Sequence, residues 1–226
     1  MNKIYDLYKK LFETYGAQGW WPFLDVENNY HPLDYNYPKN ENQIFEVCLA
    51  SILTQNRTFT SVVKSLNNLK NEELLNYKKI KEVPIEKLQE LIKPSGYHNQ
   101  KSNYILNFIE LFENLNGRIP SREELLAIKG IGPETADSIL LYGFNQAEFK
   151  IDAYTKRMLV HLKIFDEKEK YHDMKDFIEE ELKKVIKDEK KLLITYQEYH
   201  ALIVKHSKIY YSKKPYGNGC FLSMVV

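Results

Sequence analysis

The chain has 226 residues, enough for one large domain or two small lobes. Its 32 lysines and arginines balance 31 aspartates and glutamates, and the resulting net charge of +1 excludes a uniformly basic nucleic-acid-binding protein, although one basic face is permitted. With 43% hydrophobic residues the chain can form a sizeable core, whereas its apolar runs are too short for a transmembrane helix and its two cysteines make no disulfide framework. The composition predicts a reduced, cytoplasmic globular protein.

Apolar residues recur at helical spacing along most of the chain, and no alternating run long enough for a convincing strand is present. The first predicted helix covers residues 1–16 and lacks the features of a signal peptide. Residues 17–41 contain three prolines and are expected to be irregular. Further helices are predicted around 44–54, from Thr58 or Thr60 to about Leu69, and around 72–76, 84–91, 100–114, 121–128, 133–142, 152–163, 172–187 and 190–211. The sequence therefore predicts an all-α protein of roughly ten helices.

The most informative stretch is 121–141, which reads as two short helices joined by a turn. A capping-box spacing, Ser121 with Glu124, opens the first helix. Backbone N–H groups in such a turn, beside a helix N-terminus, can bind a phosphate without a charged side chain. A Gly-X-Gly turn alone is usually only a connection, so the surrounding pattern LLxIxGIGxxTAxxIL carries the assignment. The predicted phosphate-binding residues are Lys129, Gly130, Ile131 and Gly132.

Several motifs in this order resemble the helix-hairpin-helix DNA glycosylases of the endonuclease III superfamily, and most of all their 3-methyladenine branch, which lacks an iron–sulfur cluster. Besides the hairpin they are YGAQGWWP at 15–22, ILTQNRT at 52–58, LIKPSGY at 91–97, KIDAYT at 150–155 and YHALIV at 199–204. The resemblance implies an all-α fold of two helical lobes with an active-site cleft between them. The central lobe would cover 38–146 and end in the hairpin, and the second would combine 1–37 with 147–226.

The resemblance places the family's catalytic aspartate at Asp152. A fixed carboxylate stabilises the positive charge that develops on a sugar when its N-glycosidic bond breaks, and it can also position or activate water. Asp152 also stands at the start of a predicted helix, where aspartate is a common cap. The two roles are compatible, and we expect a catalytic one.

Glu134 departs from the pattern of endonuclease III, which has at this position the lysine that forms a Schiff base with the sugar. A glutamate cannot be that nucleophile. We therefore expect a monofunctional glycosylase with little or no lyase activity, although Lys129 and Lys205 remain conceivable substitutes.

The resemblance also bears on cofactors, because relatives usually close the chain with four cysteines that hold an iron–sulfur cluster. Here the first three ligand positions become Tyr210, Gly217 and Cys220, so we expect no cluster. The six histidines show no zinc-like spacing, and His200 is expected to be packed and hydrogen-bonded rather than a metal ligand. The family analogy allows a monovalent cation at the carbonyls of the hairpin turn. Residues 200–226 carry four lysines and no acidic residue, and we expect them to contact DNA phosphates.

The base pocket is predicted by analogy with the 3-methyladenine branch, in which two aromatic rings sandwich the flipped base. The resemblance suggests Phe45 and one of Trp20 and Trp21 for this role, although the tryptophans could equally be core residues. An N3-alkylated purine is cationic, and aromatic rings bind it by stacking and cation–π attraction. Relatives fill the gap left by the flipped base with a polar side chain, which here is either Gln55 or Asn56.

The sequence thus predicts a monomeric base-excision-repair glycosylase that releases damaged, alkylated purines from double-stranded DNA, associated with the nucleoid and not with a membrane. One alternative keeps the scaffold but changes the substrate to uracil, mismatched or oxidised bases, or adds lyase activity of the endonuclease III type. The second alternative is a noncatalytic DNA-binding module that uses the hairpin alone.

Overall fold

The computed structural model describes residues 2–225, and this range contains eleven α-helices and no strand. The chain forms two compact units. We call Met1–Trp20, Tyr30–Tyr35 and Gln146–Val226 the terminal unit, and Trp21–Asn29 with Asn36–Asn145 the central unit. The all-α prediction is confirmed. None of the helices in the described range has the length and apolar character needed to cross a membrane.

The segment Trp21–Asn29 lies in the central unit, whereas we expected all of 1–37 in the lobe built from the termini. Packing explains the difference. The Trp21 ring lies 5.6 Å from that of Phe59, and the backbone N–H of Leu24 donates to the Glu46 carboxylate at 2.9 Å. The chain therefore changes units between the two adjacent tryptophans.

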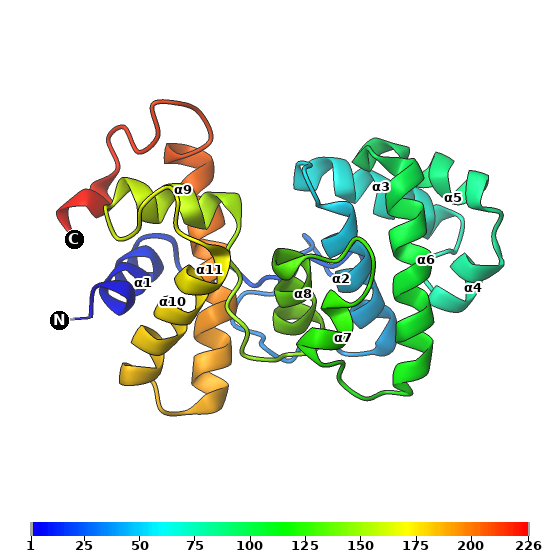
Figure 1. Cartoon of the computed structure of the whole chain (residues 1–226), viewed down its shortest axis with the longest axis horizontal. Coiled ribbons are helices and arrows are strands. Elements are labelled where there is room, and N and C mark those ends of the chain that lie inside the picture. Colours follow the sequence, from blue (N-terminus) through cyan, green and yellow to red (C-terminus); the bar gives the residue numbers. More distant parts are fainter. Residues whose placement is uncertain (1, 226) are drawn as a thin grey trace. The chain divides into compact units, whose positions relative to one another are not determined.

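The terminal unit is built around α11 (Glu189–Tyr210), which is packed by α1 (Lys3–Tyr15) and by α9 (Ala153–His161), as Figure 1 shows. The fourth helix, α10 (Tyr171–Val185), packs on α1. Local sequence sets the helix starts: the Asp188 carboxylate accepts a hydrogen bond from the N–H of Lys191 at 2.6 Å and caps α11. Most of the residues of α11 from Thr195 to Ser207 are buried, so this helix forms the centre of the core of the unit.

The central unit is organised around α2 (Glu41–Leu53), which is buried along most of its length and packs on α3 (Phe59–Asn71), α6 (His98–Leu115) and α8 (Pro133–Ser138), as Figure 1 shows. A π-helical turn at Ile139–Gly143 continues α8, and the other helices of this unit are α4 (Tyr77–Glu82), α5 (Ile85–Ile92) and α7 (Arg122–Leu126). The predicted helix at 72–76 is wrong. Glu73 has a left-handed backbone (φ 56°) that ends α3, and α4 starts only after Asn76, whose side chain caps it.

The helices α7 and α8 form the predicted hairpin. The capping box is confirmed: the N–H of Glu124 donates to the Ser121 hydroxyl at 3.2 Å, and the N–H of Ser121 donates to the Glu124 carboxylate at 2.7 Å. The Arg122 guanidinium on α7 pairs with the fully buried Asp137 on α8 at 2.7 Å. These contacts fix the turn between the two helices.

Candidate active site

The turn from Lys129 to Gly132 presents open backbone donors. The N–H of Ile131 donates to the carbonyl of Ile128 at 3.0 Å, and its side chain is buried. The N–H groups of Lys129, Gly130 and Gly132 donate to nothing in the described part of the chain. Gly132 is the N-cap of α8 and has no side chain to cap it. The turn therefore offers several N–H groups to an anion such as a phosphate.

The two glycines of this turn are required to different degrees. Gly130 has φ +96°, and a Cβ there would lie 2.2 Å from the Tyr104 ring, so only glycine fits. Gly132 has an ordinary φ of −93°, and a Cβ there would meet nothing within 4 Å. Folding therefore demands glycine at 130 but not at 132.

The two candidates for filling the gap left by a flipped base have different surroundings. The Gln55 amide donates to the carbonyl of Gly130 at 2.8 Å and to the Thr135 hydroxyl at 3.0 Å, so it ties the end of α2 to the hairpin. Asn56 is exposed and has a left-handed backbone (φ 55°), and its side chain makes no hydrogen bond with other described residues. Gln55 is thus occupied with the turn, while the Asn56 amide is available to a ligand.

Asp152 caps α9, as the sequence suggested, but only one of its oxygens does so. Its Oδ1 accepts from the N–H of Thr155 at 2.7 Å and from the Thr155 hydroxyl at 2.9 Å. Its Oδ2 lies 3.4 Å from Nε2 of His200 on α11. The Asp152 side chain is 13% exposed, and that of His200 is 1% exposed. The carboxylate is therefore fixed by both neighbours while remaining partly accessible.

The ionisation of this pair follows from its surroundings. Burial acts to raise the pKa of Asp152, but the interactions with His200 and Lys150 and the N–H of Thr155 outweigh it and hold this pKa well below its usual value. Burial lowers the pKa of His200, and the positive charge of Lys150 acts in the same direction. At neutral pH the site therefore holds an Asp152 carboxylate beside a neutral His200.

Trp20 belongs to the same cluster of the terminal unit. Its ring meets that of His200 edge-on, with centroids 5.7 Å apart at 78°. The Glu198 carboxylate on α11 holds the preceding turn by accepting from the N–H groups of Gln18 at 2.8 Å and Gly19 at 3.3 Å. The sequence did not identify Glu198 or Lys150, because their roles depend on contacts across the fold.

The other two candidate pocket residues lie in the central unit. Trp21 is 2% exposed, with its ring 5.6 Å from Phe59 and 5.3 Å from Tyr142. Phe45 is fully buried beside Phe112, 5.5 Å away, in the core around α2. A base could stack on Phe45 only if this core opened, so its position favours the core interpretation. Phe59, the half-buried neighbour of Trp21, was missed by the sequence analysis.

The region after α11 contains Cys220, the position related to a cluster ligand. Its thiol accepts from the Tyr211 hydroxyl at 3.2 Å and lies 3.1 Å from Nε2 of His206. Nδ1 of His206 lies 2.9 Å from the Tyr15 hydroxyl, and burial lowers the pKa of His206 to about 4. In residues 2–225 no group of three or more histidines, cysteines or acidic residues is placed to hold a metal. One thiol within a hydrogen-bonded aromatic cluster does not fit an iron–sulfur centre, which needs four ligands.

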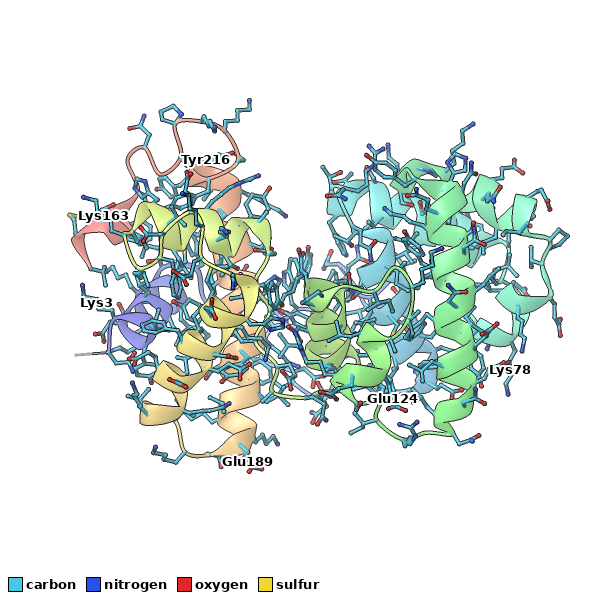
Figure 2. The ribbon with its side chains drawn as sticks, in the orientation of Figure 1. Lys3, Lys78, Glu124, Lys163, Glu189 and Tyr216 are labelled. Atoms are coloured by element: carbon cyan, nitrogen blue, oxygen red, sulfur yellow. The ribbon has the colours of Figure 1, made fainter. Side chains whose placement is uncertain are left out.

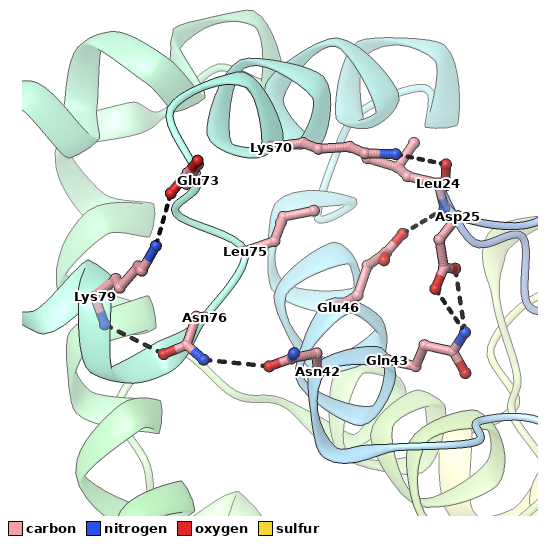
Figure 3. Close-up of a pocket in the computed structure, with 10 residues that line it drawn as sticks. All are labelled: Leu24, Asp25, Asn42, Gln43, Glu46, Lys70, Glu73, Leu75, Asn76 and Lys79. Atoms are coloured by element: carbon pink, nitrogen blue, oxygen red, sulfur yellow. Dashed lines mark hydrogen bonds and ion pairs between the residues drawn. The ribbon is translucent and has the colours of Figure 1, made fainter.

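Two surface cavities are lined by other residues. One in the terminal unit, about 450 Å³, is lined by Lys156, Arg157 and His161 of α9 and by Tyr216, which lies over this helix in Figure 2. The other, about 350 Å³, lies in the central unit and has Glu46 in its wall (Figure 3). Neither is lined by Asp152 or by the hairpin turn.

Comparison with known proteins shows the family. Residues 49–187 match the model of the HhH-GPD superfamily base excision DNA repair proteins. A Methanocaldococcus jannaschii protein with the provisional name DNA repair glycosylase MJ1434 is 39% identical over 96% of this chain and 92% of its own length. Endonuclease III of Sulfolobus acidocaldarius is 31% identical over 98% of this chain and 94% of its own length.

Solved structures agree with this assignment. The 3-methyladenine DNA glycosylase MagIII of H. pylori, bound to 1,N6-ethenoadenine, has a TM-score of 0.72 and 28% identity, and the match covers 91% of this chain and 97% of that one. An endonuclease III–DNA complex has a TM-score of 0.73, with 98% of this chain and 92% of that one covered, and its 18% identity supports the fold alone. The chain therefore belongs to the HhH-GPD superfamily of base excision DNA repair proteins, and it is a DNA N-glycosylase.

Proposed function

We propose that this glycosylase removes alkylated purines of the 3-methyladenine type from duplex DNA. The observation that carries the catalytic part of the proposal is the fixed, ionised carboxylate of Asp152, of which one oxygen caps α9 and the other has His200 as its hydrogen-bond partner. The products are the free base and an abasic site.

In the proposed reaction the bond from C1′ of the sugar to the base nitrogen breaks, and its electron pair leaves with the base. The sugar becomes an oxocarbenium-like cation, which the Asp152 carboxylate stabilises. A water oxygen then bonds to C1′, and its proton passes to the carboxylate or to solvent. The open N–H groups of the turn at Lys129–Gly132 supply a binding site for a DNA phosphate.

The chemistry of the leaving base supports the choice of substrate. An N3-alkylated purine already carries a positive charge, so it leaves readily without a general acid. Aromatic rings suit such a base, and Trp20 lies in the cluster that contains Asp152. MagIII, a structural neighbour, is a 3-methyladenine glycosylase. We assign Trp20 to the recognition of the base, and Asn56 to the gap that the base leaves.

We further propose that the enzyme is monofunctional, acts as a single chain on chromosomal DNA in the cytoplasm, and holds no iron–sulfur cluster. Glu134 cannot form a Schiff base. In the region where relatives carry the cluster, this chain has hydrogen bonds instead. Tyr211 donates to the Cys220 thiol, and His206 is bonded to Tyr15. The lysines of the tail after α11 would contact DNA phosphates. A monovalent cation at the hairpin stays a prediction, and the carbonyl of Gly130 already accepts from Gln55.

The test compares three duplexes that carry methylated bases, uracil or an oxidised base. The proposal predicts release of 3-methyladenine, identified by chromatography, with the strands left uncut. Release of uracil or of the oxidised base alone would reject the substrate class while keeping the catalytic carboxylate. Efficient cross-linking to abasic DNA under borohydride would reject the monofunctional assignment.

A further inference from the structure

The two oxygens of Asp152 face different tasks. Oδ1 is held by two donors of Thr155 and serves the start of α9. Oδ2 is directed away from that role and lies 3.4 Å from Nε2 of His200, which projects from α11, 48 residues along the chain. Any oxygen that acts on a sugar must therefore be Oδ2, and His200 is the residue that limits where it can lie.

The chemistry of the pair defines the state of the histidine. An ionised carboxylate can only accept hydrogen bonds, so the proton of a neutral His200 must be on Nε2. Burial favours this neutral form, because the His200 side chain is 1% exposed. His200 therefore donates to Oδ2 without carrying a charge that would oppose the cation formed on the sugar.

The surroundings of His200 restrict its movement. The Trp20 ring packs edge-on against the imidazole, and Trp20 is itself held by the turn that Glu198 anchors. Gly19 in this turn has φ +64°, and a Cβ there would lie 2.1 Å from the backbone nitrogen of Pro32. The histidine plane is thus set by a turn that tolerates no side chain at residue 19.

Lys150 adds a positive charge that, besides the hydrogen bond from His200, lowers the pKa of Asp152. Its side chain is 6% exposed, and its ammonium acts on both Asp152 and His200. Together, His200 on α11, Lys150 before α9 and Thr155 within α9 are the described groups that shift the ionisation of Asp152. Without them, burial alone would favour the protonated acid.

We propose that His200 is the positioning residue of Asp152: its Nε2–H fixes Oδ2, the oxygen that faces the reaction. This inference rests on the proposed function for its kinetic consequence, but its structural part is independent of any substrate. It assigns a role to a histidine that the sequence indicates only as a packed residue.

The first experiment needs no DNA. Long-range proton–nitrogen NMR of the full chain reports which ring nitrogen of each histidine carries the proton. We expect His200 to be neutral with the proton on Nε2 at pH 7, and to remain so below the pH at which an ordinary histidine titrates. A proton on Nδ1, or an ordinary titration near pH 6.5, would overturn the inference even if the enzyme is active.

The second experiment measures single-turnover base release from methylated duplex DNA by His200→Leu and His200→Gln. The glutamine amide can reach the place of Nε2 and donate to Oδ2, whereas leucine cannot. We expect His200→Leu to slow base release by roughly tenfold to a hundredfold with abasic-DNA affinity retained, and His200→Gln to recover most of the rate. Equal rates for the two variants would contradict a positioning role.

The pH profile separates positioning from a merely structural role. We expect the acid limb of the pH–rate profile to lie at higher pH in His200→Leu and in Lys150→Met than in the wild type, because each substitution removes a group that lowers the pKa of Asp152. Lys175→Met is the matched control, since Lys175 is equally buried but pairs with Glu148 and Glu179 instead. A profile unchanged from that of the wild type would reject the inference. An inactive wild type would reject the proposed function, leaving the NMR result to decide the inference.

Discussion

The N-termini of α8 and α9 differ in their capping: the first has no side-chain cap, and the second has one. The helix α8 begins after Gly132, which has no side chain, and the N–H groups of the turn before it remain open. The helix α9 begins after Asp152, whose carboxylate closes the first turn through Thr155. A bare terminus attracts an anion from outside, while a capped terminus carries its own. In the proposed reaction the first would bind a DNA phosphate, and the second would present a carboxylate to the developing cation.

The difference shows that a capping carboxylate can keep one oxygen for another partner, as the proposed catalytic role of Asp152 requires. The cap uses only Oδ1 of Asp152, and Oδ2 stays directed to His200. Capping and catalysis are thus separable by substitution, and the following changes probe each terminus in turn.

The largest expected effect is the loss of base release in Asp152→Asn. Asparagine is as good a cap as aspartate, so Asp152→Asn keeps the cap on α9, whereas the negative charge and the stability that the charge gains from His200 and Lys150 are lost. We expect the single-turnover rate to fall by about a hundredfold or more. Asp152→Ala is the comparison, because it should lose the rate and in addition about 1 kcal/mol of stability with the cap. Equal stability losses in both variants would contradict the division between the oxygens.

The open terminus is tested by Gly130→Ala and its matched control Gly132→Ala. At Gly130 a Cβ must displace the Tyr104 ring and adopt a left-handed backbone, so we expect a loss of about 1–3 kcal/mol of unfolding free energy. At Gly132 the same change meets nothing and should leave the melting temperature near that of the wild type. Similar melting temperatures for the two variants would show that the turn is not shaped as described.

Gln55 and Asn56, at the end of α2 beside the hairpin, can be tested separately for stability and for DNA binding. Gln55→Ala removes the contacts to Gly130 and Thr135 and should lower the unfolding free energy by about 1 kcal/mol. Asn56→Gly keeps a backbone that tolerates φ 55° and should leave stability unchanged while weakening binding to abasic DNA. Calorimetry and a binding titration measure the two effects. The reverse pattern would assign the gap-filling role to Gln55.

A second buried carboxylate shows what Asp152 would become without its donors. Glu46, shown in Figure 3, accepts one hydrogen bond from Leu24, and burial raises its pKa to about 7. Because the folded state then binds a proton that the unfolded state has lost, its contribution makes stability fall as pH rises from about 4.5 to about 7. Glu46→Gln should be more stable than the wild type by about 1–2 kcal/mol at pH 8 and nearly equal to it at pH 4.5. Denaturant unfolding at both pH values checks this sign.

The smallest effect is expected in the C-terminal tail. Lys213 and Lys214 are exposed and follow α11. Replacing both with alanine should weaken duplex binding modestly and reduce the slope of log affinity against log salt by about 1–2. A binding titration at several salt concentrations measures that slope, and an unchanged value would remove the tail from the DNA contact.

Local rules made much of this molecule predictable from sequence. The capping box at Ser121, the turn at Lys129–Gly132 and the cap at Asp152 depend on residues a few positions apart, and all three are present. What failed depends on distant packing. Adjacent tryptophans give no sign that Trp20 and Trp21 belong to different units, and an apolar residue at Phe45 looks the same in a pocket and in a core.

The partner of His200 illustrates the same limit. Its hydrogen-bonded character was predictable from its place on an apolar helix, but the identity of its partner, 48 residues away, was not. Glu198 and Lys150 were missed for the same reason, since each acts on a group brought near only by folding.

The most direct test of the account is the base released from methylated duplex DNA by the wild type and by Asp152→Asn, measured by chromatography under single-turnover conditions. We predict that the wild type releases 3-methyladenine from strands that stay intact, and that Asp152→Asn binds abasic DNA normally but releases almost none. Release by Asp152→Asn at the wild-type rate would contradict the role of the carboxylate on which the account depends.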